Sequence, residues 1–481
     1  MNPRHFLPLP ALLLAAGLAS AQHTERVLFL DNSMLGELQN VERRLHAPQP
    51  QEVVLVLNAP WEGRESGYAS VMEVEDGFRL YYRGGGDHTR EVVCVALSDD
   101  GINWHKPQMG LHEWEGDTEN NIIHKPETPN YVEAHNFFPL YDPGYDTPHD
   151  ERWKAVALYY LRQGGEARRT LGTWLSPDGF NWRPLSDGPA IDLGGGYDSL
   201  NVAFRDPWHD DYAVYSRVPQ KGYRHIQYTS SDDFRQWGTP VPIEFPEETR
   251  THFYTNGITP VPQLIEGEAG PWYVGMAMRF IPERQTVLSR DTDGVSDAVL
   301  IASRDRLHWD WVSRSAWIRP GLQETNWGNA HGNMTPVHGI LHTDAAEWSV
   351  YWMENYGGEA PHIRRGTLRP EGFASLHAGH QTGTATIGPL EAGGKSLLLN
   401  ASTSAAGTIR VGLTNQDGEP IPGYALEDSQ PLWGDGLFLP VSWKDGRTIE
   451  SEETLPPVMV VIELTDADLF ALRLTTDEGI E

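Results

Sequence analysis

The sequence predicts an all-β protein: a five-bladed β-propeller followed by a small C-terminal β-sandwich. One phrase, Ser-x-Asp followed four residues later by Trp, recurs at 98–104, 176–182, 231–237 and 303–309, and a copy without the Trp lies at 368–373. The copies start 55 to 78 residues apart, which suits four-stranded propeller blades with variable loops. The 48 Gly and 35 Pro residues also favour short strands and many turns.

Each copy of the phrase follows three segments with strand patterning. In the first unit these are "GYASVMEV", "FRLYYRG" and "EVVCVALSDDG", and the later units repeat this order. Alternating or short continuous apolar runs of this kind predict strands, and no segment has a long helical period. Five such blades fill residues 50–375.

The recurring phrase has the chemistry of a turn. An Asp side chain such as that of Asp100 can accept hydrogen bonds from backbone N–H groups about two residues later. Gly101 and Gly179 allow the positive φ that a tight reversal needs, and the Trp is expected to pack between neighbouring sheets. We therefore expect these aspartates to hold turns and not to catalyse.

The two ends of the chain predict three further segments. Residues 1–21 place Arg4 before an apolar run and end in Ala-Ser-Ala, the form of a secretory signal peptide cleaved near Ala21; an apolar strand or helix of the mature protein is the alternative. Export predicts a secreted or periplasmic location. Residues 22–49 are expected to supply a leading strand that closes the ring, and residues 380–481 a β-sandwich for packing or carbohydrate binding.

The charge of the chain argues against two classes of partner, and its cysteine content excludes an internal disulfide. The 37 basic and 67 acidic residues leave a net charge of −30, which argues against nucleic acid or an anionic membrane surface, since both attract positive proteins. After the N-terminal segment, no run approaches the roughly 18 apolar residues of a spanning helix, so we expect no membrane insertion. Cys94 is the only cysteine, so no internal disulfide can form.

Polar residues concentrate where the central channel should open. The start of the first strand and the end of the second lie at the same face of each blade, because the two strands are antiparallel. The second strands end in arginines that either bind a carboxylate or sulfate group of a ligand or pair with a carboxylate of the next blade. The candidate substrate-binding residues are Arg83, Arg162, Arg217, Arg279, Asn136, Asn201, Tyr254, Asn256, Trp327, Asn329 and His331.

Carboxylates at the same face suggest glycoside cleavage. That reaction uses two carboxyl groups, one to protonate the leaving oxygen and one to activate water or attack. We expect Glu354 to be the general acid and Asp198 the base or nucleophile, with Asp297 and His135 assisting. His135, His331 and Asp198 show no tight ligand spacing, so we predict no metal and no cofactor.

The repeated turns of residues 50–375 resemble those of the five-bladed propeller glycoside hydrolases, the group of families 32, 43 and 68. The resemblance implies a propeller with glycosidase activity. "FRDP" at 204–207 is similar to the Arg-Asp-Pro motif of family 32, but "LYDP" at 140–143 holds the same place one blade earlier, at the far end of a first strand. We therefore expect Asp206 in a hairpin on the opposite face and prefer Asp198. The Trp-x-Asn-Asp-Pro and Glu-Cys motifs of the family are absent.

The leading hypothesis is a secreted glycoside hydrolase that cleaves a plant or algal poly- or oligosaccharide, with anionic glycans among the candidates. One alternative is a propeller that binds glycans without cleaving them. Another is a polysaccharide lyase, in which the arginines neutralise a uronate and His135 or a tyrosine removes a proton.

Overall fold

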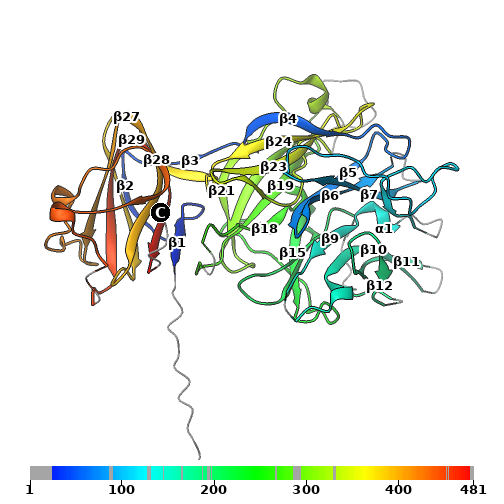
Figure 1. Cartoon of the computed structure of the whole chain (residues 1–481), viewed down its shortest axis with the longest axis horizontal. Helices are drawn as coiled ribbons and strands as arrows, with labels where there is room; N and C mark the ends of the chain where they lie inside the picture. Colours follow the sequence, from blue (N-terminus) through cyan, green and yellow to red (C-terminus); the bar gives the residue numbers. More distant parts are fainter. Residues whose placement is uncertain are drawn as a thin grey trace, which may run out of the picture.

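The computed structural model describes residues 24–476, except 86–89, 127–131, 145, 164–165, 187, 192–195, 197, 266–267, 285–293, 329–331, 451 and 453. The predicted signal peptide lies outside these residues. The described chain forms two lobes, a large propeller and a smaller curled sheet (Figure 1). No helix in this part of the chain combines the length and apolarity that crossing a membrane requires.

The large lobe is a ring of five antiparallel blades, which confirms the predicted propeller. In sheet order, the first blade consists of β5 (Gly67–Val74), β6 (Gly77–Gly84), β7 (Val92–Ser98) and β8 (Ile122–His124). The second consists of β9 (Phe138–Tyr141), β10 (Trp153–Gln163), β11 (Glu166–Ser176) and β12 (Arg183–Pro184). The third consists of β13 (Val202–Arg205), β14 (Tyr212–Gln220), β15 (Tyr223–Ser231) and β16 (Val241–Pro242). The fourth consists of β17 (His252–Thr255) and β18 (Ile258–Pro260), both paired with β19 (Tyr273–Ile281), then β20 (Val295–Ser303) and β21 (Trp309–Ile318).

The fifth blade closes the ring with a strand from the other end of the chain. It consists of β22 (Leu341–Asp344), β23 (Glu347–Glu354), β24 (His362–Leu368) and β4 (Gln49–Val56). Val56 pairs with His362, so the N-terminal strand is the outer strand of the last blade. Short helical turns connect blades 1 and 2 and blades 4 and 5, at α1 (Val132–His135) and η2 (Glu324–Trp327), and a third, η1 (His149–Glu151), lies between β9 and β10 of blade 2.

The segment 22–49 differs from its prediction. Its strands β1 (Glu25–Leu28), β2 (Leu35–Gln39) and β3 (Glu42–Leu45) pair with the small lobe, not with the ring. The reason is burial: Val27 packs in the core of the small lobe, while Leu28 packs in a core cluster that joins the two lobes. The ring is closed by β4, which begins only where this segment ends.

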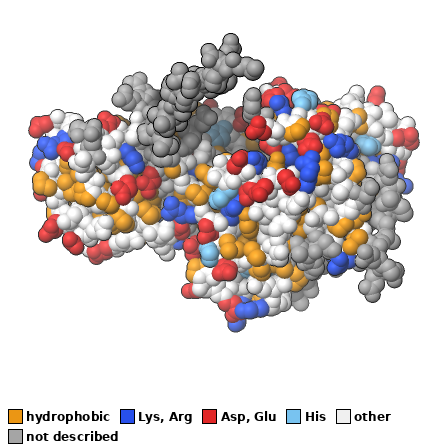
Figure 2. Space-filling model, turned by 90° about the horizontal axis from the view of Figure 1, so that it is seen from below, with side chains coloured by type: hydrophobic (Ala, Val, Ile, Leu, Met, Phe, Trp, Pro, Cys, Tyr) orange, Lys and Arg blue, Asp and Glu red, His pale blue; other side chains and the backbone are white. Residues whose placement is uncertain are grey.

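The small lobe confirms the predicted C-terminal sandwich and adds β1–β3 to it. Its other strands are β25 (Ala374–Ala378), β26 (Gly383–Leu390), β27 (Ser396–Thr414), β28 (Asp435–Pro440) and β29 (Val458–Thr475), with the turns η3 (Leu426–Asp428) and η4 (Lys444–Gly446). The long strands β27 and β29 pair with each other along most of their length and curl the sheet around an apolar core. On the face that Figure 2 presents, acidic and basic side chains are interspersed over both lobes.

The repeated turns form as predicted. Asp100 Oδ1 accepts hydrogen bonds from the backbone N–H groups of Ile102 at 2.8 Å and Asn103 at 2.7 Å. The same pair of bonds recurs at Asp178, Asp233 and Asp305. The residue after each Asp has a positive φ, and so does the equivalent residue of the copy that lacks Trp: Gly101 (70°), Gly179 (78°), Phe234 (62°), Arg306 (73°) and Glu371 (62°).

We expect Gly179→Ala to lower the free energy of unfolding by about 2–4 kcal/mol, because it combines a left-handed backbone with overpacking. A Cβ atom there would lie 2.7 Å from Tyr81 Oη and 2.8 Å from a ring carbon of Trp153. The matched control is Gly222→Ala, at φ +85° with no heavy atom within 4 Å, for which only the backbone cost of about 1 kcal/mol is expected. Urea unfolding measures both, and equal losses would contradict the packing argument.

Four buried charges join the two lobes. Arg26 on β1 and Arg473 on β29 meet Glu268 from blade 4 and Glu371 from the last turn of the ring, and each of the four side chains is at most 1% exposed. Arg473 Nε lies 2.7 Å from a carboxylate oxygen of Glu268, and Arg26 Nη1 lies 3.2 Å and 3.3 Å from oxygens of Glu268 and Glu371. The lobes are therefore packed as one unit at this point.

Candidate active site

Side chains from all five blades meet at the face where the second strands end. We call them the funnel cluster: Tyr68, Arg83, Glu91, His135, Asp198, Arg217, Tyr254 and Tyr356. A continuous series of contacts links the cluster, from the Tyr356 hydroxyl through Arg83, His135 and Asp198 to Arg217. The sequence rule for strand ends therefore located the meeting point of the blades.

His135 lies between two carboxylates. Its Nε2 is 2.9 Å from Asp198 Oδ1, and its Nδ1 is 2.8 Å from Glu91 Oε1. Burial and the nearby Arg83 lower the pKa of His135, but its hydrogen bonds to Asp198 and Glu91 outweigh both and raise that pKa above the ordinary value. With an acceptor at each ring nitrogen, the imidazolium is the form that this site favours.

Asp198 is an accessible, ionised carboxylate. Its side chain is 36% exposed, and besides His135 it faces Arg169 Nη1 at 3.3 Å and Arg217 Nη2 at 4.0 Å. The hydrogen bond from His135, opposed by partial burial and helped by the charges of His135, Arg217 and Arg169, holds the pKa of Asp198 far below its usual range. Such a group suits a base or nucleophile and not a proton donor.

Arg83 positions the cluster. Its guanidinium is buried and donates to Glu65 O at 2.6 Å and to Tyr356 Oη at 3.1 Å, and it lies 4.6 Å from the centre of the Tyr68 ring. Tyr68 has a φ of +48°, a strained conformation for a bulky residue, and strain of this kind is often concentrated at functional sites. Arg83 thus supports the site, where the sequence predicted contact with an anionic ligand.

The other predicted arginines have different surroundings. Arg217 donates from Nε to Gly196 O at 3.1 Å and stacks on Tyr254 at 5.3 Å. Arg279 pairs across β19 and β20 with Asp297, with Nε 2.8 Å from Oδ1 and Nη2 bonded to Oδ2. Asp297 is therefore held in an ion pair within its blade, and its predicted assisting role has no support from its contacts. The side chain of Arg162 lies outside the described residues.

Three predicted substrate-binding amides are buried in the ring. The Asn136 amide donates to Ser199 O at 2.7 Å and accepts from Leu158 N at 2.8 Å. Asn201 donates to Ser199 O, and Asn256 donates to Tyr215 O and accepts from Ile258 N. All three residues are at most 3% exposed. Their hydrogen bonds hold the inner strands together, so these contacts give no support to the prediction that the three amides bind substrate.

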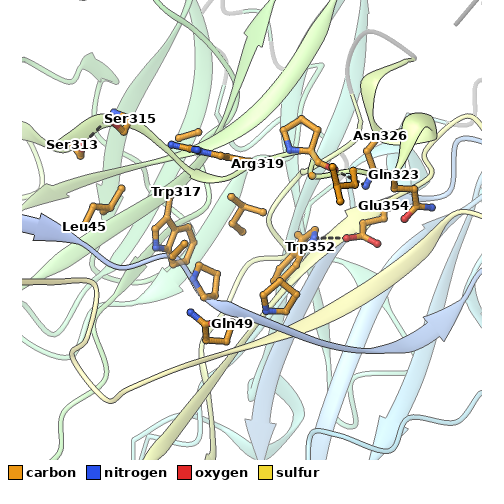
Figure 3. A pocket seen from close by; sticks show the side chains of 18 of the residues that line it. Leu45, Gln49, Ser313, Ser315, Trp317, Arg319, Gln323, Asn326, Trp352 and Glu354 are labelled. Carbon is orange, nitrogen blue, oxygen red and sulfur yellow. Dashed lines mark hydrogen bonds between the residues drawn. The ribbon is translucent and has the colours of Figure 1, made fainter. Parts of the chain in front are cut away.

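Glu354 does not share the funnel with Asp198. It accepts hydrogen bonds from Arg364 Nε at 2.9 Å, Trp352 Nε1 at 3.0 Å and His362 Nε2 at 3.2 Å, and it borders a cavity of about 790 Å³ beside the outer strand of blade 4 (Figure 3). Burial raises its pKa, but these bonds prevail and hold it below the ordinary value. A general acid needs the opposite shift.

Glu133 is a second carboxyl group close in sequence to the funnel cluster, and its pKa is shifted in the direction that a proton donor needs. It lies on α1, two residues before His135, and burial raises its pKa despite a backbone hydrogen bond that lowers it. The sequence analysis placed no catalytic role on it. Its place just before the first strand of blade 2 can be read from the sequence, but the burial that raises its pKa depends on the fold.

Two further predicted binding residues, Asn329 and His331, lie outside the described residues. Trp327, just before them, is 36% exposed and donates its indole N–H to Gly321 O at 2.8 Å. Within the described residues, no group of three or more His, Cys, Asp or Glu side chains is arranged to hold a metal ion.

The Arg-Asp-Pro match has a structural role, as predicted. Asp206 follows the end of β13, whereas Asp198 precedes its start, so the two lie at opposite faces. Asp206 accepts a hydrogen bond from Tyr273 Oη of the next blade at 2.7 Å. One blade earlier, Asp142 accepts in the same way from Tyr212 Oη at 2.5 Å. These aspartates tie adjacent blades together.

Sequence reasoning missed Glu91, Arg169 and Tyr356. Glu91 stands next to β7, the third strand of its blade, whose start lies at the same face as the end of the second strand. Asp297 holds the equivalent place near the start of β20, the third strand of blade 4, so the start of the third strand is the signal that could have found Glu91. Arg169, the fourth residue of β11, also lies near the start of a third strand and reaches Asp198 from there.

The raised pKa of His135 predicts a pH-dependent stability. A group whose pKa is raised by folding stabilises the fold fully below its unfolded pKa of about 6.5 and loses that contribution as pH rises through the folded pKa. The melting temperature of the wild type should therefore fall between pH 6 and pH 9 more steeply than that of His135→Gln. Parallel curves for the two proteins would show that the imidazolium does not stabilise the cluster.

No protein-family model and no curated protein matches this chain. Solved structures similar to it include a protein described as a glycoside hydrolase, with 13% identity and a TM-score of 0.43 over 67% of this chain and 92% of that chain. Others are an exo-β-1,3-galactanase from Phanerochaete chrysosporium (12% identity, TM-score 0.40, 88% of this chain and 100% of that chain) and a β-fructofuranosidase from Bombyx mori (12%, 0.41, 90% and 94%).

Proposed function

We propose that the protein is a glycoside hydrolase that cleaves a plant or algal poly- or oligosaccharide at the funnel cluster. The observation that carries this proposal is Asp198, an ionised and accessible carboxylate held by His135 at the point where the five blades meet. Tyr254, from blade 4, adds an aromatic ring beside it. A charged carboxylate next to aromatic rings at the meeting point of the blades suits recognition and cleavage of a sugar.

In the proposed reaction, Asp198 takes a proton from water or attacks the anomeric carbon directly. Glu133 donates a proton to the oxygen of the leaving sugar. His135, held by Glu91, keeps Asp198 ionised and oriented, so it acts as a positioning residue. The glycosidic C–O bond breaks, and water supplies the hydroxyl of one product and the proton that restores the acid.

A substrate panel tests the proposal. Purified protein is incubated with neutral and acidic polysaccharides, and new reducing ends and ultraviolet absorbance are both recorded. New reducing ends without absorbance are expected. Unsaturated products that absorb would indicate the lyase, and specific binding without any product would indicate a glycan-binding propeller; either result would overturn the hydrolase proposal.

Glu133→Gln provides a second test. If the Glu133 carboxyl is the proton donor, the variant should lose about 10²–10³-fold in kcat on a natural glycan. It should lose much less on an aryl glycoside whose leaving group needs no proton. Equal losses on both substrates would contradict the assignment.

We propose that the protein acts after export, because residues 1–21 have the charged, apolar and small-residue order of a signal peptide. Expression of the full chain in a bacterial host, followed by fractionation and N-terminal sequencing, should yield a periplasmic or secreted protein that begins at Gln22. Recovery of the uncleaved chain in the cytoplasm would contradict export.

A further inference from the structure

We infer that a cavity beside the funnel, on blade 4, is a subsite for an anionic sugar unit that carries a carboxylate or a sulfate; the inference rests on the proposed action on a glycan. This blade-4 cavity has a volume of about 660 Å³, within the range of small-molecule sites. Its polar lining includes Arg279, Arg284, Asp297 and Arg319, and Trp327 forms part of its wall.

Two of these arginines have no partner for their charge. Among the described residues, the guanidinium groups of Arg284 and Arg319 make no hydrogen bond and no ion pair, and both side chains are exposed. Arg279, in contrast, is neutralised by Asp297 in the same cavity. Counted over the described residues that line it, the cavity therefore carries an excess of two positive charges, on a chain whose net charge is −30. Guanidinium groups bind carboxylates and sulfates through paired N–H donors.

An aromatic side chain stands in the same cavity. The indole N–H of Trp327 donates to Gly321 O at 2.8 Å, which fixes the orientation of the ring, while 36% of the residue stays exposed. Aromatic rings offer an apolar surface to the C–H face of a sugar, and this surface costs little conformational entropy because the ring is already held. Trp327 and the two arginines thus combine a contact for the sugar ring with a contact for its charge.

The cavity is fixed to the wall of the funnel. Asn333 donates to Gly328 O at 2.8 Å, next to Trp327, and accepts from the backbone N–H of Tyr356 in the funnel cluster at 2.8 Å. Arg319 also borders the neighbouring cavity that holds Glu354 (Figure 3). A glycan bound with one unit near Asp198 could therefore place another unit against Trp327 without a change in the fold.

Calorimetric titration tests the subsite in an Asp198→Asn background, where binding is separated from turnover. The probes are a tetragalacturonate, a sulfated galactan tetrasaccharide and a neutral galactotetraose. At least one anionic probe should bind at least about tenfold more tightly than the neutral one, and added salt should weaken it selectively. Arg319→Gln and Arg284→Gln should each weaken that probe about tenfold and leave the neutral probe within about twofold.

Arg314→Gln is the matched control, because Arg314 lies on the adjoining strand β21 and is paired with Glu247. It should change no affinity. Arg319→Lys keeps the charge but loses the paired donors, so it should bind the anionic probe with an affinity between those of the wild type and Arg319→Gln. This variant also tests the subsite if Arg319→Gln fails to fold. Equal affinity for all three probes, no binding of either anionic probe, or an Arg319→Gln affinity equal to that of Arg314→Gln would overturn the inference.

The two proposals can fail separately. If a neutral glycan is cleaved at a rate that neither Arg284→Gln nor Arg319→Gln changes, the proposal of an anionic subsite is refuted and the hydrolase proposal stands. Binding of an anionic probe that depends on Arg319, without turnover of any glycan in the panel, would retain the subsite and remove the hydrolase.

Discussion

Asp198→Asn is expected to lower kcat about 10³-fold while leaving the melting temperature nearly unchanged. Asparagine keeps the shape of the side chain and can still bond to His135, but it cannot hold the negative charge that a base or nucleophile needs. The side chain of Asp198 is 36% exposed, so water can solvate the asparagine that replaces it, and the fold should tolerate the change. Initial rates on the glycan found in the substrate panel, together with thermal unfolding, measure both quantities.

Glu354→Gln is the matched comparison. Glu354 is bonded to Arg364, His362 and Trp352 on the side of its blade that faces blade 4, and its replacement should lower kcat less than about tenfold. A loss as large as that of Asp198→Asn would restore Glu354 as the general acid that the sequence analysis expected. Full activity in Asp198→Asn would remove Asp198 from the mechanism.

The blades could be predicted because the signal that marks them is local. Each turn is held by hydrogen bonds within six residues, such as those from the backbone of Ile102 and Asn103 to Asp100. The residues that form these bonds recur as one motif in the sequence. The place of β1–β3 could not be predicted in the same way. Glu25 pairs with Leu474, which is far away in the sequence. The sequence of a short apolar strand does not show which distant strand it will pair with.

The site was predicted in part for a related reason. Strand order tells at which face a strand ends, and this located Asp198, His135 and Tyr254 together. Strand order does not tell toward which neighbouring blade the side chain at the end of a strand points. At the end of β23, Met353 packs toward blade 1, whereas Glu354 lies on the opposite side of the strand. Likewise, the pattern found both Arg279 and Asp297 but not their pairing, because it does not show that the two residues stand directly across from each other on adjacent strands.

Arg473→Met should lower the free energy of unfolding by about 3–5 kcal/mol, because it leaves two buried carboxylates with one cation between them. Arg473 contacts both Glu268 and Glu371, and neither carboxylate is exposed. Urea unfolding at pH 8 measures the loss. The control is Arg44→Met, whose pair with Glu42 is exposed and should be worth less than about 1 kcal/mol.

The loss in Arg473→Met should also depend on pH, with a sign that identifies its cause. Burial already raises the pKa of Glu268 although Arg26 and Arg473 lower it, so removal of Arg473 raises that pKa further. A carboxyl group whose pKa is higher in the folded than in the unfolded state leaves the fold more stable at low pH, where the group is protonated. It lowers the stability as pH rises through the folded pKa, because the buried group must then ionise. The difference in stability between Arg473→Met and wild type should therefore be smaller at pH 5 than at pH 8. A difference that does not change with pH would mean that lost packing, and not an uncompensated charge, is what destabilises the junction of the two lobes.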